Sequence, residues 1–163
     1  YDTEQTLYAL TVQPDRDRTY LAQLWQTSNR RAEWVSLVDF YADTPAAVMT
    51  LPLDPVEQPI LVGVGNRLIK LYRQADLSWA VQQHFLAPAL RITSIVTTDY
   101  YLEEGTIYVT TNQGVLQSRD AGATWTSVGE GLAGRTFVAF LPAQDERPAY
   151  AVELGGALWR LNP

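Results

Sequence analysis

The chain has 163 residues, of which 47% are hydrophobic and 18% are charged, a composition typical of one globular domain and unlike that of a disordered segment. Its formal net charge is -6 and Lys70 is its only lysine, which disfavours nucleic acid as a partner. No apolar run reaches the roughly 20 residues that a membrane-spanning helix needs, so we expect no direct membrane insertion.

The chain has no cysteine and one histidine, His84, which excludes disulfides, a thiolate nucleophile and Cys- or His-rich metal centres. We therefore expect neither a metal nor a cofactor. His84 lies in the run VQQHFL, and we expect it at the outer end of a strand with a solvated side chain rather than in a catalytic role.

Short extended runs, rich in β-branched and aromatic residues, follow one another along the whole chain. They cover residues 6–12, 21–26 and 33–38; then 46–52, 59–65, 67–72 and 78–83; then 92–98, 106–112, 114–118 and 124–129; and finally 136–142, 148–154 and 156–161. Gly, Asn, Pro and Asp separate the runs, and no sustained period of 3.6 residues indicates a long helix. The sequence therefore predicts an all-β fold.

A repeat organises these runs. Trp34, Trp79 and Trp125 are spaced by 45 and then 46 residues, and aligning the chain on them aligns the runs as well. Four short strands every 45 or so residues is the period of a β-propeller blade, whose faces are buried by stacking on neighbouring blades. We predict about four consecutive four-stranded antiparallel blades in one domain. The repeat units cover approximately residues 1–45, 46–90, 91–134 and 135–163.

The octet SRDAGATW carries a more specific signal. It places Ser118, Asp120, Gly122, Thr124 and Trp125 in the pattern Ser-x-Asp-x-Gly-x-Thr-Trp. This pattern resembles an Asp-box, the motif of the bacterial neuraminidase (BNR) repeats found in sialidases, sortilin-type receptors and photosystem II assembly-factor-type propellers. The octets ending at the other two tryptophans, TSNRRAEW and YRQADLSW, match it only in part.

Each residue of the octet has a structural role in a hairpin between the third and fourth strands of a blade. The Asp120 carboxylate can accept backbone N–H groups, and the Ser118 and Thr124 hydroxyls can close the turn from either side. Gly122 permits a backbone angle that other residues avoid, while Trp125 offers a large apolar face. We interpret the octet as a turn that stabilises the fold, in preference to reading Asp120 as a catalytic acid.

The first and last repeat units each supply only three runs, so the chain holds fourteen predicted strands. Two arrangements explain this number. The ends can close a four-bladed wheel in an unusual way, or the chain is a segment of a larger propeller. We favour the segment, because unpaired strand edges promote aggregation unless strands from elsewhere cover them.

The resemblance implies that loops between the second and third strands share one face with the connections between blades, and that ligands bind there. Arg67, Arg91, Asn112 and Arg135 fall on that predicted binding face. Arg91 and Arg135 each precede an innermost strand and can together clamp a carboxylate or phosphate. The alternative is that each arginine solvates the start of its strand or pairs with a nearby carboxylate.

The opposite face carries the loop DYYLEEG, with Tyr100, Tyr101, Glu103 and Glu104. Because tyrosine is enriched at protein interfaces, this loop is a candidate contact surface; the alternative is a loop packed on itself. The charged cluster at residues 15–18 is most simply a solvated hairpin tip with local charge pairs.

Three functions fit these features. The first is a non-catalytic scaffold that binds a protein or peptide, with a role as a subunit of a larger envelope or extracellular complex as one form of it. It agrees with the single histidine and with the lack of a nucleophile–base pair. The resemblance to these families favours a location outside the cytoplasm. The second is a sialidase-like glycoside hydrolase, which would need clustered arginines and a Tyr–Glu pair on one face. The third is a purely structural repeat module of a larger protein.

Overall fold

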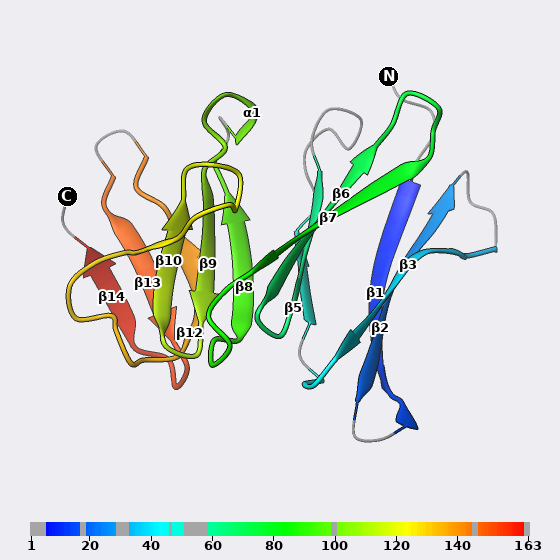
Figure 1. Cartoon of the computed structure of the whole chain (residues 1–163). Helices are drawn as coiled ribbons and strands as arrows, with labels where there is room; N and C mark the ends of the chain where they lie inside the picture. Colours follow the sequence, from blue (N-terminus) through cyan, green and yellow to red (C-terminus); the bar gives the residue numbers. More distant parts are fainter. Residues whose placement is uncertain are drawn as a thin grey trace.

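The computed structural model describes residues 6–16, 19–28, 33–45, 47–50, 59–98, 101–144 and 147–161. Within these residues, strands β1 to β14 form four separate antiparallel sheets of three, four, four and three strands. In each sheet, strands that follow one another in the sequence lie side by side. Figure 1 shows the sheets in a row in chain order, from β1–β3 on the right to β12–β14 on the left.

Each strand overlaps one of the predicted runs, although β3 extends four residues beyond its run and β11 covers only two residues of its own. The first sheet contains β1 (Thr6–Pro14), β2 (Tyr20–Ser28) and β3 (Val35–Ala42), and the second contains β4 (Ala47–Thr50), β5 (Ile60–Val64), β6 (Arg67–Arg73) and β7 (Trp79–Phe85). The third contains β8 (Ile92–Thr97), β9 (Ile107–Thr111), β10 (Gly114–Ser118) and β11 (Thr126–Ser127), and the fourth contains β12 (Phe137–Leu141), β13 (Ala149–Glu153) and β14 (Leu158–Leu161). The all-β prediction is confirmed, and the strands of the described residues form four separate antiparallel sheets of three or four strands.

One helical turn, α1 (Tyr101–Glu104), stands between β8 and β9, where the sequence predicted only a loop. The Gly105 backbone N–H donates to the carbonyl of Tyr101 at 2.8 Å and closes this turn. In the described part of the chain, no helix is long and apolar enough to cross a membrane.

The core consists of three apolar layers, one between each pair of successive sheets. The alternation of side chains along β5 shows how the second sheet serves two layers. Ile60 and Val62 contribute to the layer shared with the first sheet, whereas Leu61 contributes to the layer shared with the third sheet. Every residue of β5 is therefore buried, and the strand is one continuous apolar run.

Gly63 lies in β5 at the point where the second sheet approaches the third. A Cβ atom at this position would lie 2.8 Å from Cγ2 of Ile92, at the start of β8. Since real Cβ contacts are not that short, the absence of a side chain allows the two sheets to pack closely here.

Candidate functional site

One end of the sheets gathers the turns that follow β5 and β9 together with the connections between sheets; it is the lower end in Figure 1. Asn112 occupies one of these turns. Its Oδ1 accepts the backbone N–H of Arg91 at 2.7 Å, and its Nδ2 donates to the carbonyl of Ala89 at 3.2 Å. Asn66, in the preceding sheet, similarly donates from Nδ2 to the carbonyl of Leu86 at 2.9 Å. Both asparagines thus tie the connection 86–91 to the sheets.

Arg91 folds back on the connection to which it belongs. Its Nη1 donates to the carbonyls of Pro88 and Leu90 at 2.7 and 2.8 Å. Its Nη2 forms an ion pair with Oδ2 of Asp43 at 2.9 Å, which links the connection to the end of the first sheet. The guanidinium is therefore engaged in holding local structure.

Arg135 is engaged in a different place, within the fourth sheet. Its Nη1 lies 3.1 Å from Oε1 of Glu153, and its guanidinium carbon lies 4.5 Å from the centre of the Trp159 ring. The Trp159 indole N–H donates to Oε2 of the same glutamate at 2.9 Å, and this hydrogen bond, together with Arg135, lowers the pKa of Glu153.

The structure does not form the clamp of Arg91 and Arg135 that the sequence suggested. Each arginine binds its own carboxylate, which is the alternative that the sequence left open. The two positions also differ by one residue, because Arg91 directly precedes β8 whereas Thr136 separates Arg135 from β12. The equivalent backbone bonds agree with this offset: Asn112 N–H donates to the carbonyl of Arg91, and Leu154 N–H donates to that of Thr136.

Arg67 lines an open depression of about 310 Å³ between the first and second sheets, here called the Arg67 depression. Its walls are formed by Thr19, Tyr41, Ala42 and Asp43 from the first sheet and its turns, and by Val64, Asn66, Arg67 and Phe85 from the second. The Arg67 Nη2 donates to the carbonyl of Tyr41 and so bridges the two sheets.

Two residues with exposed aromatic side chains border this depression, but only Phe85 shares a sheet face with Arg67. Tyr41 alternates with the buried Phe40 and Ala42, so its ring lies on the other face of the first sheet and only its backbone carbonyl meets Arg67. Tyr41 is 59% exposed and Phe85 is 66% exposed. Phe85 is the cross-strand partner of Arg67, and Asp43 brings the Arg91 ion pair to the rim. The depression therefore combines apolar surface, a cation, a carboxylate and the amide of Asn66.

The α1 loop lies at the other end of β8, away from Arg91. Tyr101 is only 6% exposed and packs with Ile107 in the core, so its side chain is not available at an interface. Burial, and then the neighbouring Tyr72, raise the pKa of Tyr101 to about 12. Glu103 and Glu104 are exposed, while Tyr100 lies outside the described residues.

A sialidase-like hydrolase would need its arginines and its Tyr–Glu pair on one face, and the described residues do not bring Arg91 together with the α1 loop. Six residues of β8, a strand of roughly 20 Å, separate Arg91 from the α1 loop. A buried tyrosine with a raised pKa is also a poor source of phenolate near neutral pH.

Residues 118–125, here called the Asp120 hairpin, join β10 to β11. The Asp120 carboxylate accepts the Thr124 backbone N–H at 2.8 Å, the Thr124 hydroxyl at 2.6 Å and the Ser118 hydroxyl at 2.7 Å. These bonds, with those to Thr124 contributing most, lower the pKa of Asp120 to about 2. The Gly122 N–H donates to Ser118 Oγ at 2.8 Å, and Trp125 packs against the layer between the second and third sheets.

The Asp120 hairpin rests on the second sheet. Lys70 on β6 is 3% exposed, and its Nζ donates to the carbonyl of Ala121 at 2.6 Å. Gly122 is buried there with a φ of +95°, and a Cβ atom would lie 2.9 Å from Cδ2 of Leu68. The hairpin thus connects two sheets in addition to two strands.

His84 lies beside this hairpin and is half-buried, so the expectation of a solvated side chain is wrong. Its Nε2 is buried without a hydrogen-bond partner among the described residues. Burial, followed by the charge of Lys70, lowers the pKa of His84, and Asp120 opposes this shift.

Sequence reasoning missed three residues of the Arg67 depression and one turn. Tyr41, Asp43 and Phe85 border the depression only because the first two sheets pack together, and no motif marks them. The turn that precedes Trp79 contains Asp76, whose Oδ1 accepts the Ser78 N–H at 2.9 Å and the Ser78 hydroxyl at 2.6 Å. We call residues 74–79 the Asp76 hairpin. The sequence signal for this turn is an aspartate that shortly precedes a hydroxyl residue and a tryptophan.

The charged tip at residues 15–18 is described in part. The Asp15 N–H donates to the carbonyl of Thr19 at 2.9 Å, and the Thr19 hydroxyl donates to the carbonyl of Arg16 at 2.7 Å, which closes the turn between β1 and β2. Residues 17 and 18 lie outside the described residues.

Comparison with known proteins gives a likeness in structure only. No family model matches the sequence. No curated protein matches it either. Among solved structures, the chain is similar to the extracellular domain of a protein from B. thetaiotaomicron that is assigned as a hybrid two-component system, with a TM-score of 0.58 and 13% identity. The match covers 91% of this chain and 19% of the other, so the chain spans about a fifth of that structure's length.

Proposed function

We propose that the chain is a run of β-propeller blades that acts as a non-catalytic scaffold and binds a protein or peptide in the Arg67 depression. The division into sheets of three, four, four and three strands supports blades. The Asp120 hairpin supports the kinship with Asp-box repeats, because its aspartate, hydroxyls and glycine act together to hold a turn.

The exposed ring of Phe85 beside Arg67 is the observation that carries the proposal. Arginine is enriched among the residues that contribute most to protein–protein binding, and an aromatic ring provides a large apolar contact area. A peptide can place an apolar side chain against the Phe85 ring while its carbonyl or carboxylate accepts from Arg67.

The open shape of the depression favours an extended segment over a small metabolite. Pockets for small molecules bury most of the ligand surface, whereas this depression is open and lies on the boundary between two sheets. The ends of the sheets around it supply further polar groups at Asn66 and Asp43.

A panel of displayed random peptides, selected for binding to the wild-type chain, tests the proposal. We expect peptides whose dissociation constants rise about tenfold or more in Arg67→Ala and Phe85→Ala variants, as at interface positions that dominate binding. Leu77→Ala is the matched control, because Leu77 is as exposed as Phe85, at 68%, but lies outside the depression.

Selected peptides that bind Arg67→Ala and Phe85→Ala as tightly as they bind the wild type would contradict the proposal. Circular dichroism of both variants checks that the sheets are retained. A loss of affinity in Leu77→Ala equal to that in Phe85→Ala would place the binding surface elsewhere.

We also propose an extracytoplasmic location for the scaffold. The similar solved structure is itself an extracellular domain. Protease added to intact cells tests this location, because an extracytoplasmic chain is cleaved while the membrane is intact. A chain that stays protected until the cells are lysed would contradict it.

A further inference from the structure

Among the described residues, one face of the fourth sheet is covered by the third sheet and the other face is exposed. One face packs on the third sheet through Phe140, Ala151 and Trp159. Register places the following residues together on the opposite face, here called the Tyr150 face: Leu141, Tyr150, Val152, Leu158 and the exposed Arg160. Leu141 is 60% exposed and Leu158 is 66% exposed, so this face presents a group of apolar side chains to solvent.

The third sheet shows how such a face is covered. Tyr108 is the second residue of β9 as Tyr150 is the second residue of β13. Val115 pairs with the fourth residue of β9 as Leu158 pairs with the fourth residue of β13. The positions of the Tyr150 face therefore repeat, in the same register, positions of the third sheet that point toward the fourth.

In the third sheet these positions are occupied by contacts with β12. The Tyr108 ring centre lies 5.0 Å from the Phe140 ring centre, and Val115 is only 1% exposed in the same layer. The interface between the third and fourth sheets thus depends on an aromatic side chain of an innermost strand placed on a tyrosine.

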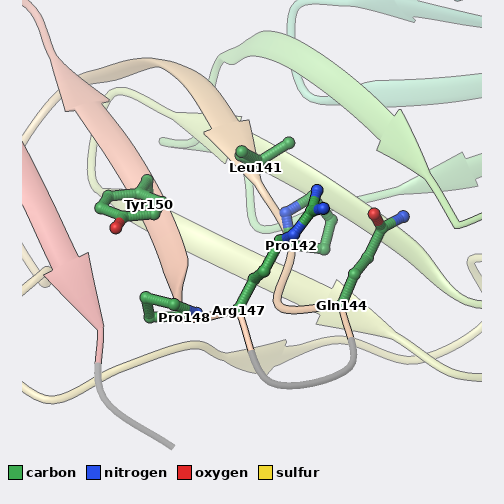
Figure 2. A pocket seen from close by; sticks show the side chains of 6 residues that line it. All are labelled: Leu141, Pro142, Gln144, Arg147, Pro148 and Tyr150. Carbon is green, nitrogen blue, oxygen red and sulfur yellow. The ribbon is translucent and has the colours of Figure 1, made fainter.

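A hollow of about 200 Å³ lies at the corresponding place on the fourth sheet. Leu141, Pro142, Gln144, Arg147, Pro148 and Tyr150 line it. Figure 2 shows Leu141 on β12 and Tyr150 on β13, with Arg147 and Gln144 extending from the loop that joins these strands. The hollow therefore adjoins the ring that corresponds to Tyr108.

The outer face of the first sheet does not complement this surface. There the Trp25 indole N–H donates to the Thr11 hydroxyl at 2.9 Å, and Gln23 Nε2 donates to Oδ1 of Asp39 at 3.1 Å. Ser36 also donates to Asp39 Oδ1, at 2.9 Å. Covering this polar ladder with leucine and valine side chains would remove a carboxylate from water, which is costly. Head-to-tail stacking of copies of this chain is therefore disfavoured.

We propose that the Tyr150 face docks a further antiparallel sheet of the same repeat type, whose innermost strand seats a phenylalanine against Tyr150 as Phe140 sits against Tyr108. The partner is thus a repeat unit with an apolar, aromatic innermost strand. This interface is separate from the Arg67 depression and does not depend on the ligand proposed there.

The test uses thiol accessibility, because the chain contains no cysteine. A Leu158→Cys substitution is made in the native chain and in an extended chain, in which residues 118–161 are repeated once after Arg160. The added unit supplies a second copy of β12 at high effective concentration. We expect the thiol to react at least about tenfold more slowly in the extended chain, because reaction then requires local opening.

Two controls isolate the contact. Phe140→Asp in the added copy alone restores the fast reaction of Leu158→Cys. Leu102→Cys, on α1 between β8 and β9 of the third sheet, reacts at one rate in both chains, since Leu102 is 53% exposed and lies outside the Tyr150 face. Leu141→Cys repeats the measurement at a second position of the Tyr150 face.

Equal reaction rates at Leu158→Cys in the native and extended chains would overturn the proposal, whether the added unit folds elsewhere or stays unfolded. A native chain that sediments as a dimer, and becomes monomeric with Leu158→Asp, would also overturn it by assigning the face to a second copy. Peptide binding in the Arg67 depression is measured independently, so the two proposals fail separately.

Discussion

The Asp120 hairpin and the Asp76 hairpin both close a turn with hydrogen bonds to an aspartate, but the spacing of the residues differs. Each uses a carboxylate to accept the backbone N–H and the hydroxyl of the residue just before a tryptophan. In the Asp120 hairpin that residue is Thr124, four positions after the aspartate, and in the Asp76 hairpin it is Ser78, two positions after it. Both hairpins also hold a non-glycine residue at positive φ, Ala121 at 56° and Leu77 at 67°.

The two hairpins differ in what lies beneath them. The Asp120 hairpin is attached to its surroundings: the Ala121 carbonyl accepts from buried Lys70, and the Ala121 N–H donates to Gly105 at 2.9 Å. In the Asp76 hairpin, by contrast, Leu77 is 68% exposed. Local hydrogen bonds are therefore sufficient to make the turn, whereas the contacts with a neighbouring sheet decide how much the turn adds to the stability of the fold.

The largest expected effect comes from Gly122, where backbone conformation and packing act together. Gly122→Ala forces a side chain into a φ of +95° and against Leu68, and we expect the free energy of unfolding to fall by about 3 kcal/mol. Gly131→Ala is the matched control, because Gly131 has a φ of +88° with nothing within 4 Å, and we expect a loss of about 1 kcal/mol from strain alone. Urea denaturation measures both; equal losses would mean that the hairpin is not packed on the second sheet.

The features that the sequence predicted depend on residues close together in the chain. The Asp120 hairpin closes within eight residues, and each strand of a sheet pairs with its neighbour in sequence, so residue type and spacing suffice to find them. The Asp76 hairpin matches the octet only in part, because its aspartate precedes the tryptophan by three residues instead of five.

The features that the sequence did not predict depend on packing between sheets. Arg91 and Asp43 are 48 positions apart, and Lys70 and Ala121 are 51 positions apart. Which charges meet across such distances depends on the stacking of the sheets and on a one-residue offset such as that between Arg91 and Arg135. The Arg67 depression arises in the same way, because its walls come from two sheets.

Lys70 gives the next largest effect, and it distinguishes the two hairpins directly. Lys70→Met keeps the length of the side chain but leaves the Ala121 carbonyl without its charged donor, so we expect a loss of about 2 kcal/mol. Hydrogen exchange should accelerate at the backbone N–H of Thr124 and not at that of Ser78.

Arg73→Met is the matched control on the other hairpin. The Arg73 guanidinium carbon lies 5.1 Å from the centre of the Trp79 ring, a contact that contributes about 0.5–1 kcal/mol at an accessible site. If Lys70→Met cost no more than Arg73→Met, the buried ammonium would not anchor the Asp120 hairpin.

The smallest expected effect is the loss of stability at low pH, which allows the Asp120 and Asp76 carboxylates to be compared directly. Hydrogen bonds to Thr124 and Ser118 hold the pKa of Asp120 at about 2, and hydrogen bonds to Ser78 also lower the pKa of Asp76. A depressed carboxyl pKa stabilises the folded state above the unfolded pKa of about 3.9, and this stability is lost as the pH falls through the folded pKa. Urea titrations between about pH 5 and about pH 2 cover both the unfolded and the folded pKa values of these carboxyls. Over this range, Asp120→Asn should flatten the acid decline in stability of the wild type more than Asp76→Asn does. The same flattening in both variants would show that the extra contacts of the Asp120 hairpin do not strengthen its carboxylate bonds, and would place the whole difference between the hairpins in Lys70 and Gly122.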